Sequence, residues 1–267
     1  MTWTKASKGE SNLILSKIFQ TFFLLASLIF QSKRKSSRQN STPSNIIAVR
    51  NIALVKSRSK SIVVGVAGGT GAGKSTIVKE ILKQLGTENI SVIQHDSYYK
   101  NRPELSFEER TKINFDHPDS LEINLLVDHL NLLISGKNVE IPVFHYFTKY
   151  LKDLSTKKVE SLPILIVEGI LVLHDKELRD LMNLKVFVDL PPDLRFIRRL
   201  KRDLSEYGRS VESVTKQYLA TIRKMHEEYV EPSKIYADVY IPDGWRNRQA
   251  VSLLVSKLQT LQEKHFS

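Results

Sequence analysis

Residues Gly68-Gly69-Thr70-Gly71-Ala72-Gly73-Lys74-Ser75 decide the fold, because they fit the phosphate-binding pattern G-x-x-x-x-G-K-[ST] and form a predicted P-loop. An apolar, β-branched run over 62–67 precedes this loop and predicts a buried strand. Residues 76–85 follow with apolar side chains on one helical face, and Gly86 predicts the end of that helix. This order places backbone N–H groups and the positive end of the helix dipole against phosphate oxygens.

The end of the P-loop carries the side chains that phosphate chemistry needs. We expect Lys74 to reach the β- and γ-phosphates of a nucleotide, and Ser75 to bind Mg²⁺. The whole segment from Gly68 to Thr76 is therefore the predicted ATP-binding site.

Composition and charge exclude several classes of protein. The chain has 267 residues, enough for one or two domains, and its hydrophobic content of 41% allows a real core. It has no cysteine, which excludes disulfides, thiolate catalysis and cysteine-ligated zinc. Almost all of the formal net charge of +11 lies in residues 1–60, which hold eleven Lys and Arg against the single acid Glu10. A nucleic-acid-binding domain would carry its basic excess on the fold, so we expect no nucleic-acid partner.

Residues 1–60 are predicted to be a basic extension, and residues 61–267 a separate P-loop kinase-type domain. Three interpretations of the extension are open. Its poverty in acids and its Ser and Arg content suit an organelle transit peptide. The apolar run 13–30, followed by basic residues, suits a membrane anchor or membrane contact. The third interpretation is a dispensable disordered leader, so the expected location is the cytoplasm, an organelle matrix or a membrane-tethered form.

Two acids stand near the ends of predicted strands. The run 91–94 predicts a strand beside the first one, and Asp96 follows its carboxyl end. The run 164–170 predicts another buried strand, which carries Glu168. Because α/β sheets bind ligands at this edge, Asp96 is a candidate general base and Mg²⁺ ligand, and Glu168 a second metal-side carboxylate. A turn or cap is the alternative role for Asp96, and we interpret His95 as structural or exposed.

The segment between these strands predicts a helix and an aromatic strand. A Pro and an Asp-Ser pair in 114–120 are typical of a helix start, and a helix is expected over 121–135. Asp116, just before it, is a candidate cap. The run 139–147 alternates like a strand, whereas 152–160 is polar and predicts a loop.

The last third of the chain predicts two more strands, 184–190 and 237–242, and a closing helix over 248–263. The five strands that alternate with helices predict an α/β fold: a P-loop NTPase-type, doubly wound parallel sheet of about five strands, with a helical lid. The lid is expected from a helix after Pro191 and a second helix over 211–229.

Four arginines fall on one face of the first lid helix: Arg195, Arg198, Arg199 and Arg202. Their guanidinium groups repel one another unless anions lie opposite, and nucleotide phosphates would meet that need. A solvated basic face is the alternative.

Over 61–263 the sequence resembles the uridine kinase (uridine–cytidine kinase) family of P-loop kinases. The resemblance rests on ordered blocks at 68–76, 96–99, 114–119, 168–171, 198–203, 208–210, 217–218, 231–234 and 236–238. It implies that ATP, or GTP, phosphorylates the 5′-hydroxyl of uridine or cytidine with Mg²⁺ as cofactor, a step of pyrimidine salvage. It also implies a homo-oligomer.

The resemblance assigns a role to each matching position. Lys74, Asp96 and Arg202 match catalytic positions, with Asp96 as the base and Arg202 as a lid arginine on the phosphates. The Mg²⁺ positions are Ser75, Asp96 and Glu168. The nucleoside-contacting positions are Tyr99, Phe115, Asp116, Phe144, Lys149, Arg199, Arg209 and Gln217. Among these a carboxylate and an amide can bind two vicinal hydroxyls, which favours ribose over deoxyribose.

The base-reading loop departs from the family pattern. The family has Pro-Val-Tyr-x-[Phe/Tyr]-x-x-His-x-Arg, and here Phe144, Lys149 and Leu151 replace its Tyr, His and Arg. Lys149 can donate to O4 of uracil but cannot accept from the amino group of cytosine. Tyr207 and Asp243 also stand where the family has arginines.

Two alternative functions remain. A phosphoribulokinase-like sugar-phosphate kinase shares the P-loop and the Glu-Gly strand end, although the blocks 208–210 and 231–234 favour the uridine kinase resemblance. The other is a nucleotide-binding kinase homologue with an altered substrate or without turnover. A switch GTPase would need an Asn-Lys-x-Asp stretch after a strand, which the sequence lacks.

Overall fold

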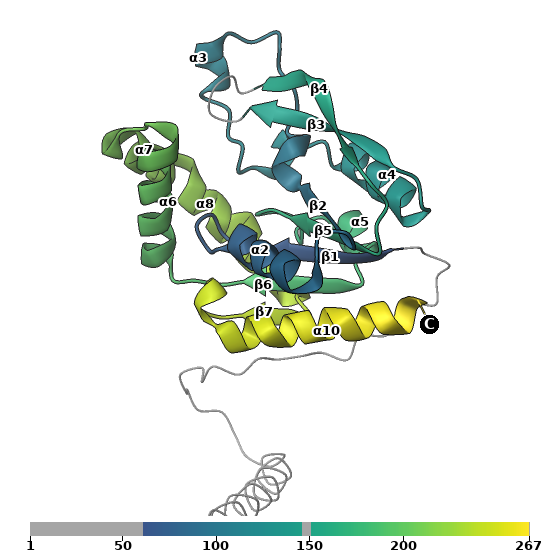
Figure 1. Ribbon diagram of the computed structural model, residues 1–267. Helices are drawn as coiled ribbons and strands as arrows, with labels where there is room; N and C mark the ends of the chain where they lie inside the picture. Colours follow the sequence, from purple (N-terminus) through teal and green to yellow (C-terminus); the bar gives the residue numbers. More distant parts are fainter. Residues whose placement is uncertain (1–60, 146–150, 267) are drawn as a thin grey trace, which may run out of the picture. The chain divides into compact units, whose positions relative to one another are not determined.

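The computed structural model describes residues 61–145 and 151–266. The extension 1–60 and Lys149 lie outside the described residues, together with the roles predicted for them. Figure 1 shows a parallel sheet with helices on both of its faces and a further group of helices, α6 to α8, at one end.

The central sheet consists of five parallel strands, as predicted. Their order across the sheet is β2-β5-β1-β6-β7. The strands are almost entirely apolar because helices cover both faces of the sheet. They are β1 (Ile62–Ala67), β2 (Ile90–Gln94), β5 (Ile164–Glu168), β6 (Leu184–Val188) and β7 (Val239–Ile241).

The place of β2 differs from the prediction that it lies beside β1. β5 lies between them and pairs with β1 on one side and with β2 on the other. The neighbours of a strand depend on the path of the crossover connections, which local sequence does not encode. The register nevertheless pairs both Gln94 and Val66 with Glu168, so the carboxyl ends of all three strands meet at one edge.

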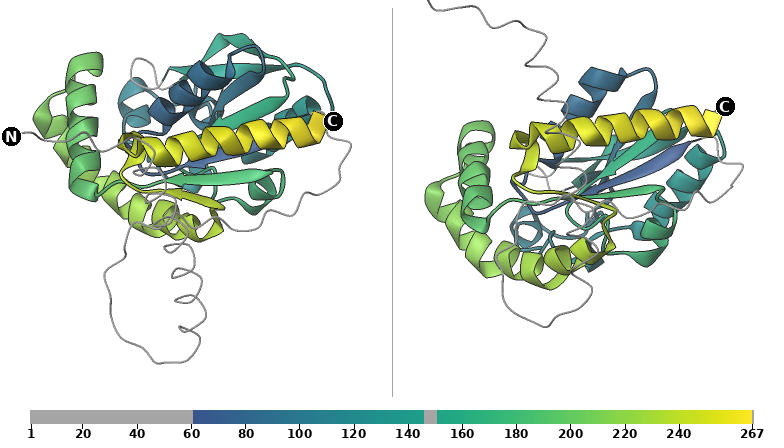
Figure 2. Two further views of the ribbon diagram at one scale, coloured as in Figure 1. Left: turned by 60° about the horizontal axis from the view of Figure 1, so that its bottom comes forward. Right: turned by 90° about the horizontal axis from the view of Figure 1, so that it is seen from below.

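Alternate side chains of the strands build two hydrophobic cores, one on each face of the sheet. On one face Ile62, Val64 and Val66 share a core with α2 (Lys74–Leu85) and α10 (Arg248–Phe266). On the other face Val63 and Phe187 share a core with α4 (Ile123–Ile134) and α5 (Lys176–Asp180). Figure 2 shows α10, in yellow, along the first face.

β3 (Val139–His145) and β4 (Leu151–Val159) form a separate antiparallel pair. β3 agrees with the prediction within the described residues, but the loop predicted over 152–160 is wrong. The segment forms a strand, but its sequence lacks the apolar alternation by which strands are predicted, because Thr156, Lys157 and Lys158 are exposed. Pairing supplies the order instead, with Glu140 opposite Lys158 as a pair of opposite charges.

The lid begins with α6 (Pro192–Tyr207), which ends at Gly208 in the left-handed conformation, at a φ of 62°. After this break the helical turns continue to Tyr236, beyond the predicted end near 229. Two of them, η3 and η4, are π-helical, a rare form that frequently occurs at functional sites. The turns are α7 (Val211–Gln217), η3 (Tyr218–Ile222), α8 (Arg223–Met225), η4 (His226–Val230), α9 (Glu231–Ser233) and η5 (Lys234–Tyr236).

Short turns complete the described part: η1 (His95–Tyr98), α3 (Phe107–Arg110), η2 (Pro118–Ser120) and η6 (Gly244–Arg246). The cap predicted as one option for Asp116 is not formed, because His117 caps η2 instead. Within 61–145 and 151–266, no helix has both the length and the hydropathy that a membrane crossing requires.

Candidate active site

The P-loop lies at the carboxyl end of β1 and leads directly into α2. Gly68 and Gly73 adopt positive φ values of 142° and 104°, which side chains disfavour. A Cβ at Gly68 would also collide with the carbonyl oxygen of Val188 at the end of β6. Lys74 Nζ donates to the carbonyl oxygens of Gly68, at 2.9 Å, and Gly69, at 3.3 Å. The amine is thus held across the loop that carries the backbone N–H groups.

Two carboxylates face this amine from the edge of the sheet. Glu168 is buried at the end of β5, and its Oε2 atom has no hydrogen-bond partner. Burial raises the pKa of Glu168, while the charge of Lys74 and the hydroxyl of Ser75 oppose that rise. Desolvation also raises the pKa of Asp96, against the charge of Lys74, although solvent-accessible surface on Asp96 limits this effect. Burial in turn lowers the pKa of Lys74.

The same corner fits a magnesium ion. A buried carboxylate oxygen without a partner is costly unless a cation or donor reaches it, and Glu168 Oε2 is such an atom. Mg²⁺ in phosphoryl-transfer sites takes one or two protein carboxylates and keeps water and phosphate oxygens for the rest. Among the described residues, no group of three or more His, Asp or Glu side chains is arranged so that it could hold a metal ion.

Three aromatic side chains from distant segments form one wall next to Asp96. The ring centroid of Tyr99 lies 4.9 Å from that of Phe115 and 5.3 Å from that of Phe144. Phe115 and Phe144 are 5.7 Å apart, and all three pairs meet edge to face. The Tyr99 hydroxyl donates to Asp96 Oδ1 at 3.4 Å. The predicted nucleoside-contacting aromatics are therefore brought together, beside the predicted base.

Asp116 lies in the same region and is buried. Burial raises the pKa of Asp116 to about 6, with Arg199 opposing the rise and Asp96 adding to it. His95 is buried and packs so close to Gly169 that a Cβ on Gly169 would clash with it. Its role is structural, and burial lowers the pKa of His95 to about 3.

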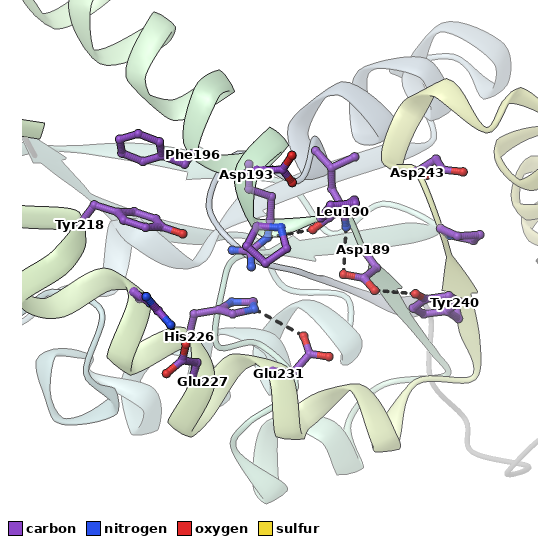
Figure 3. A pocket seen from close by; sticks show the side chains of 15 residues that line it. Asp189, Leu190, Asp193, Phe196, Tyr218, His226, Glu227, Glu231, Tyr240 and Asp243 are labelled. Atoms are coloured by element: carbon purple, nitrogen blue, oxygen red, sulfur yellow. Dashed lines mark hydrogen bonds and ion pairs between the residues drawn. The ribbon is translucent and has the colours of Figure 1, made fainter. Parts of the chain in front are cut away.

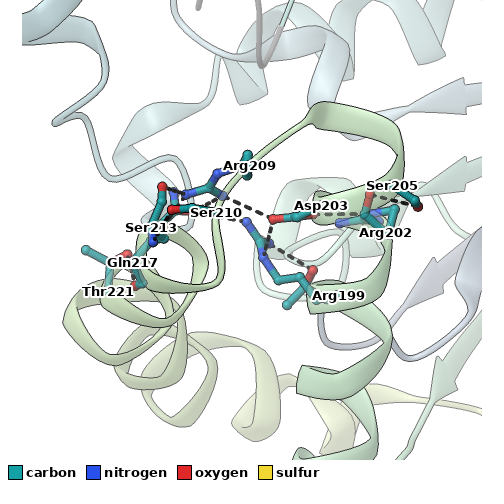
Figure 4. Close-up of polar contacts among 10 residues, drawn as sticks. Arg199, Arg202, Asp203, Ser205, Arg209, Ser210, Ser213, Gln217 and Thr221 are labelled. Atoms are coloured by element: carbon teal, nitrogen blue, oxygen red, sulfur yellow. Dashed lines mark hydrogen bonds and ion pairs between the residues drawn. The ribbon is translucent and has the colours of Figure 1, made fainter.

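Figure 4 shows a polar network that joins the two lid helices around Asp203. Asp203 Oδ2 is 3.3 Å from Arg199 Nε and 3.1 Å from Arg209 Nη1, and Asp203 Oδ1 is 3.5 Å from Arg202 Nε. Gln217 Oε1 accepts from Arg209 at 2.7 Å and from Arg199 at 3.2 Å. The predicted ribose contacts Arg199 and Gln217 thus bind each other in this structure.

Asp203 is a residue of this network for which the sequence had suggested no role. Asp203 follows Arg199 at the i+4 spacing that pairs opposite charges on a helix, and this signal was available. The alternative of a solvated basic face is wrong, because Arg195 and Arg199 are buried. Arg199 Nη1 donates to Thr70 Oγ1 at 3.1 Å, and Arg198 Nη1 donates to the carbonyl oxygen of Ala72 at 3.4 Å. These arginines contact the P-loop itself.

A cavity of about 780 Å³ lies behind the P-loop (Figure 3). It is bordered by the ends of β6 and β7, the start of α6 and the helical turns from Tyr218 to Glu231. Asp96, Asp116 and Glu168 are not among its lining residues. It is therefore distinct from the corner in which the predicted site residues meet.

Comparison with known proteins shows the family of the chain. Residues 63–250 match the model of the phosphoribulokinase / uridine kinase family. The chain is 50% identical to a uridine kinase of Chloroflexus aurantiacus over 198 residues, which is 74% of this chain and 94% of that protein. It is 45% identical to a uridine kinase of Streptococcus thermophilus over 205 residues, or 77% and 97% of the two chains. The phosphoribulokinase from Rhodobacter spheroides has a TM-score of 0.53 at 16% identity, covers 68% of this chain and 70% of its own, and shows the fold alone.

The fold and the site define a P-loop kinase, an enzyme that transfers a phosphoryl group to an alcohol. Within that class, this chain belongs to the phosphoribulokinase / uridine kinase family.

Proposed function

We propose that the protein phosphorylates the 5′-hydroxyl of uridine with ATP. The observation that best supports this function is that Asp96 lies next to two groups of side chains. On one side lies Lys74 of the P-loop, and on the other the aromatic wall that contains Tyr99. An attacking hydroxyl held against this wall would lie between its base and the phosphate donor. The high identity to proteins named uridine kinase supports the choice of acceptor.

Each side chain has a distinct task in this proposal. Asp96 accepts the proton of the attacking hydroxyl, and Lys74 and Arg202 stabilise the charge on the transferring phosphoryl group. Asp116, with Arg199 and Gln217, binds the ribose hydroxyls, which requires that the present contact between Arg199 and Gln217 opens toward the sugar.

Ser75, Asp96 and Glu168 are the residues that would hold Mg²⁺, and the orphaned Glu168 oxygen supports this choice. The ion neutralises charge on the phosphates when it is bound. We infer ATP as the donor because the family consists of P-loop kinases, and a competition between ATP and GTP would test that choice.

A coupled assay of nucleotide consumption tests the proposal. The full-length protein is given ATP and Mg²⁺ with uridine, cytidine or ribulose 5-phosphate, and the product is identified by mass. We expect uridine 5′-monophosphate, and we expect no product from Asp96→Asn. Turnover with ribulose 5-phosphate and none with nucleosides would replace the proposal with a phosphoribulokinase-like activity.

We also propose that residues 1–60 are not part of the catalytic domain, since no motif of the site lies before Ile62. A chain that begins near Ser57 should keep the activity of the full-length protein. Loss of activity on truncation would show that the extension contributes to the domain. Fractionation of cells that express both forms would separate the targeting, anchoring and leader interpretations, and light scattering would test the expected homo-oligomer.

A further inference from the structure

Gly69 is the one position of the P-loop where the need for glycine comes from neighbouring side chains alone. Its φ is outside the left-handed region that Gly68, Gly71 and Gly73 occupy. A Cβ at Gly69 would lie 2.6 Å from Arg195 Nη1 and 2.9 Å from His226 Cε1. Two side chains of the lid therefore lie against the loop at Gly69, and a Cβ at this position would displace at least one of them.

His226 is held in this position by a chain of polar contacts. Its Nε2 lies 3.4 Å from Glu231 Oε2. Lys234 Nζ binds Glu231 Oε1 at 3.1 Å and Asp189 Oδ2 at 2.9 Å. Asp189 stands directly after β6, and Tyr240 of β7 donates to the same Oδ2 atom. The imidazole is thus fixed to the carboxyl ends of two strands of the sheet.

Arg195 adds a second support at the same point of the loop. The residue is 4% exposed, and its Nε donates to the carbonyl oxygen of Leu190 at 3.0 Å. Its own carbonyl oxygen lies where a Cβ of Gly71 would be, so α6 also limits the next glycine. Burial is the main reason that the pKa of Lys74 is lowered, and the charge of Arg195 makes a small contribution in the same direction.

We propose that His226, oriented by Glu231 and acting together with Arg195, is a positioning residue that holds the P-loop in its nucleotide-binding conformation. A loop that binds phosphate through backbone N–H groups has no rigid side chain of its own to fix it, so the supporting contacts determine its geometry. The contact also ties nucleotide binding to the lid, because His226 begins the π-helical turn η4. Side chains far from the phosphates therefore contribute to ATP affinity.

The cavity behind the P-loop makes this proposal testable by chemical rescue. His226 and Arg195 form its wall toward Gly69, and exposed residues such as Glu227 and Asp193 line it elsewhere. Its volume of about 780 Å³ exceeds by far the space of one imidazole molecule. Free imidazole can thus replace the missing side chain of His226→Ala.

The experiment measures the Kd of ATP with Mg²⁺ by titration calorimetry on the full-length protein, without nucleoside. The inference takes from the proposed function only that ATP is the nucleotide. A failed uridine assay would therefore not affect the measurement of ATP binding. We expect His226→Ala to weaken ATP about tenfold and 50 mM imidazole to recover most of the loss. His226→Phe, which fills the space without a nitrogen, should not respond to imidazole. Lys224→Ala, an exposed change on the same helical segment, should stay within twofold of the wild type.

A second variant keeps the test decisive if His226→Ala does not fold. Glu231 is 45% exposed, so Glu231→Gln should fold and should weaken ATP about threefold by loosening the imidazole. In both variants the loss should appear in the Kd of ATP, whereas the KM of the nucleoside, which binds at the aromatic wall, should stay within twofold of the wild type. An unchanged ATP affinity in either variant overturns the proposal. So does a loss in His226→Ala that imidazole leaves unaffected.

Discussion

The ion-pair network around Asp203 supports a quantitative prediction about stability. Asp203 is fully buried, and two of its partners, Arg199 and Arg209, expose only 6% and 16% of their side chains. Removal of one partner from a buried ion pair typically costs about 3–5 kcal/mol, because charge is left without compensation. Arg202 adds little, since it is 40% exposed and 3.5 Å away. We therefore expect Asp203→Ala to lower the free energy of unfolding by about 3–5 kcal/mol.

Asp203→Asn should cost less, because it keeps the shape and one acceptor. Because the hydrogen bonds lose their charged acceptor, we expect the free energy of unfolding to fall by about 1.5–3 kcal/mol. In a domain of this size 1 kcal/mol shifts Tm by about 2–4 °C, so the Ala variant should melt roughly 6–20 °C lower than the wild type. Differential scanning fluorimetry measures these shifts, with Glu206→Gln as an exposed control on the same helix.

A double-mutant cycle separates the network from a general packing effect. If Arg209 is truncated as well, its unpaired charge disappears, and the double variant should be more stable than the sum of the two single losses predicts. A melting temperature of Asp203→Ala within 2 °C of the Glu206→Gln control would refute the reasoning. Full additivity in the cycle would show that the loss does not come from the ion pairs.

Three further predictions concern the reaction. Lys74→Ala should reduce kcat about 10²- to 10³-fold through the loss of a charged donor, whereas Asp96→Asn should abolish turnover yet leave ATP binding measurable by calorimetry. Burial raises the pKa of Asp116 to about 6, so its carboxylate becomes protonated as the pH falls below that value. The KM of uridine should therefore rise between pH 7 and pH 5. Asp116→Asn should have a high KM for uridine at every pH in this range. Lys149 should favour uridine over cytidine about 5- to 150-fold in kcat/KM, and Lys149→His should narrow that ratio; equal use of both nucleosides by the wild type would contradict the prediction.

The sequence predicted the parts of the fold that are set by local pattern. Buried parallel strands are continuous apolar runs, and the P-loop spacing is dictated by the phosphate that it binds, so β1, β5 and α2 could be located to within a residue or two. β4 could not be located this way, because its order comes from pairing with β3 and not from burial. The position of β2 beside β5 depends on the crossovers, which no short segment encodes.

The candidate site shows the same division between local pattern and tertiary contact. Tyr99, Phe115 and Phe144 come from three separate segments, and only the resemblance to a family could place them on one wall before the structure did. The contact between Gln217 and Arg199 was likewise beyond the sequence, since each side chain was expected to face a sugar. Contacts of this kind depend on the angle between two helices, which changes with packing.

The arginines of α6 form a face that the sequence identified, and in the structure this face also contacts the P-loop. With about 100° between successive residues of a helix, Arg198 and Arg199 point about 100° apart, and Arg195 lies between them one turn earlier. A face that wide reaches around the P-loop: Arg199 meets Thr70, Arg198 meets Ala72, and Arg195 lies behind Gly69. Three arginines of this helix therefore lie against the loop that we propose to bind the phosphates. Gly69 does not have a positive φ, so its backbone conformation does not require glycine. The close approach of Arg195 is the feature of the structure that favours a glycine there.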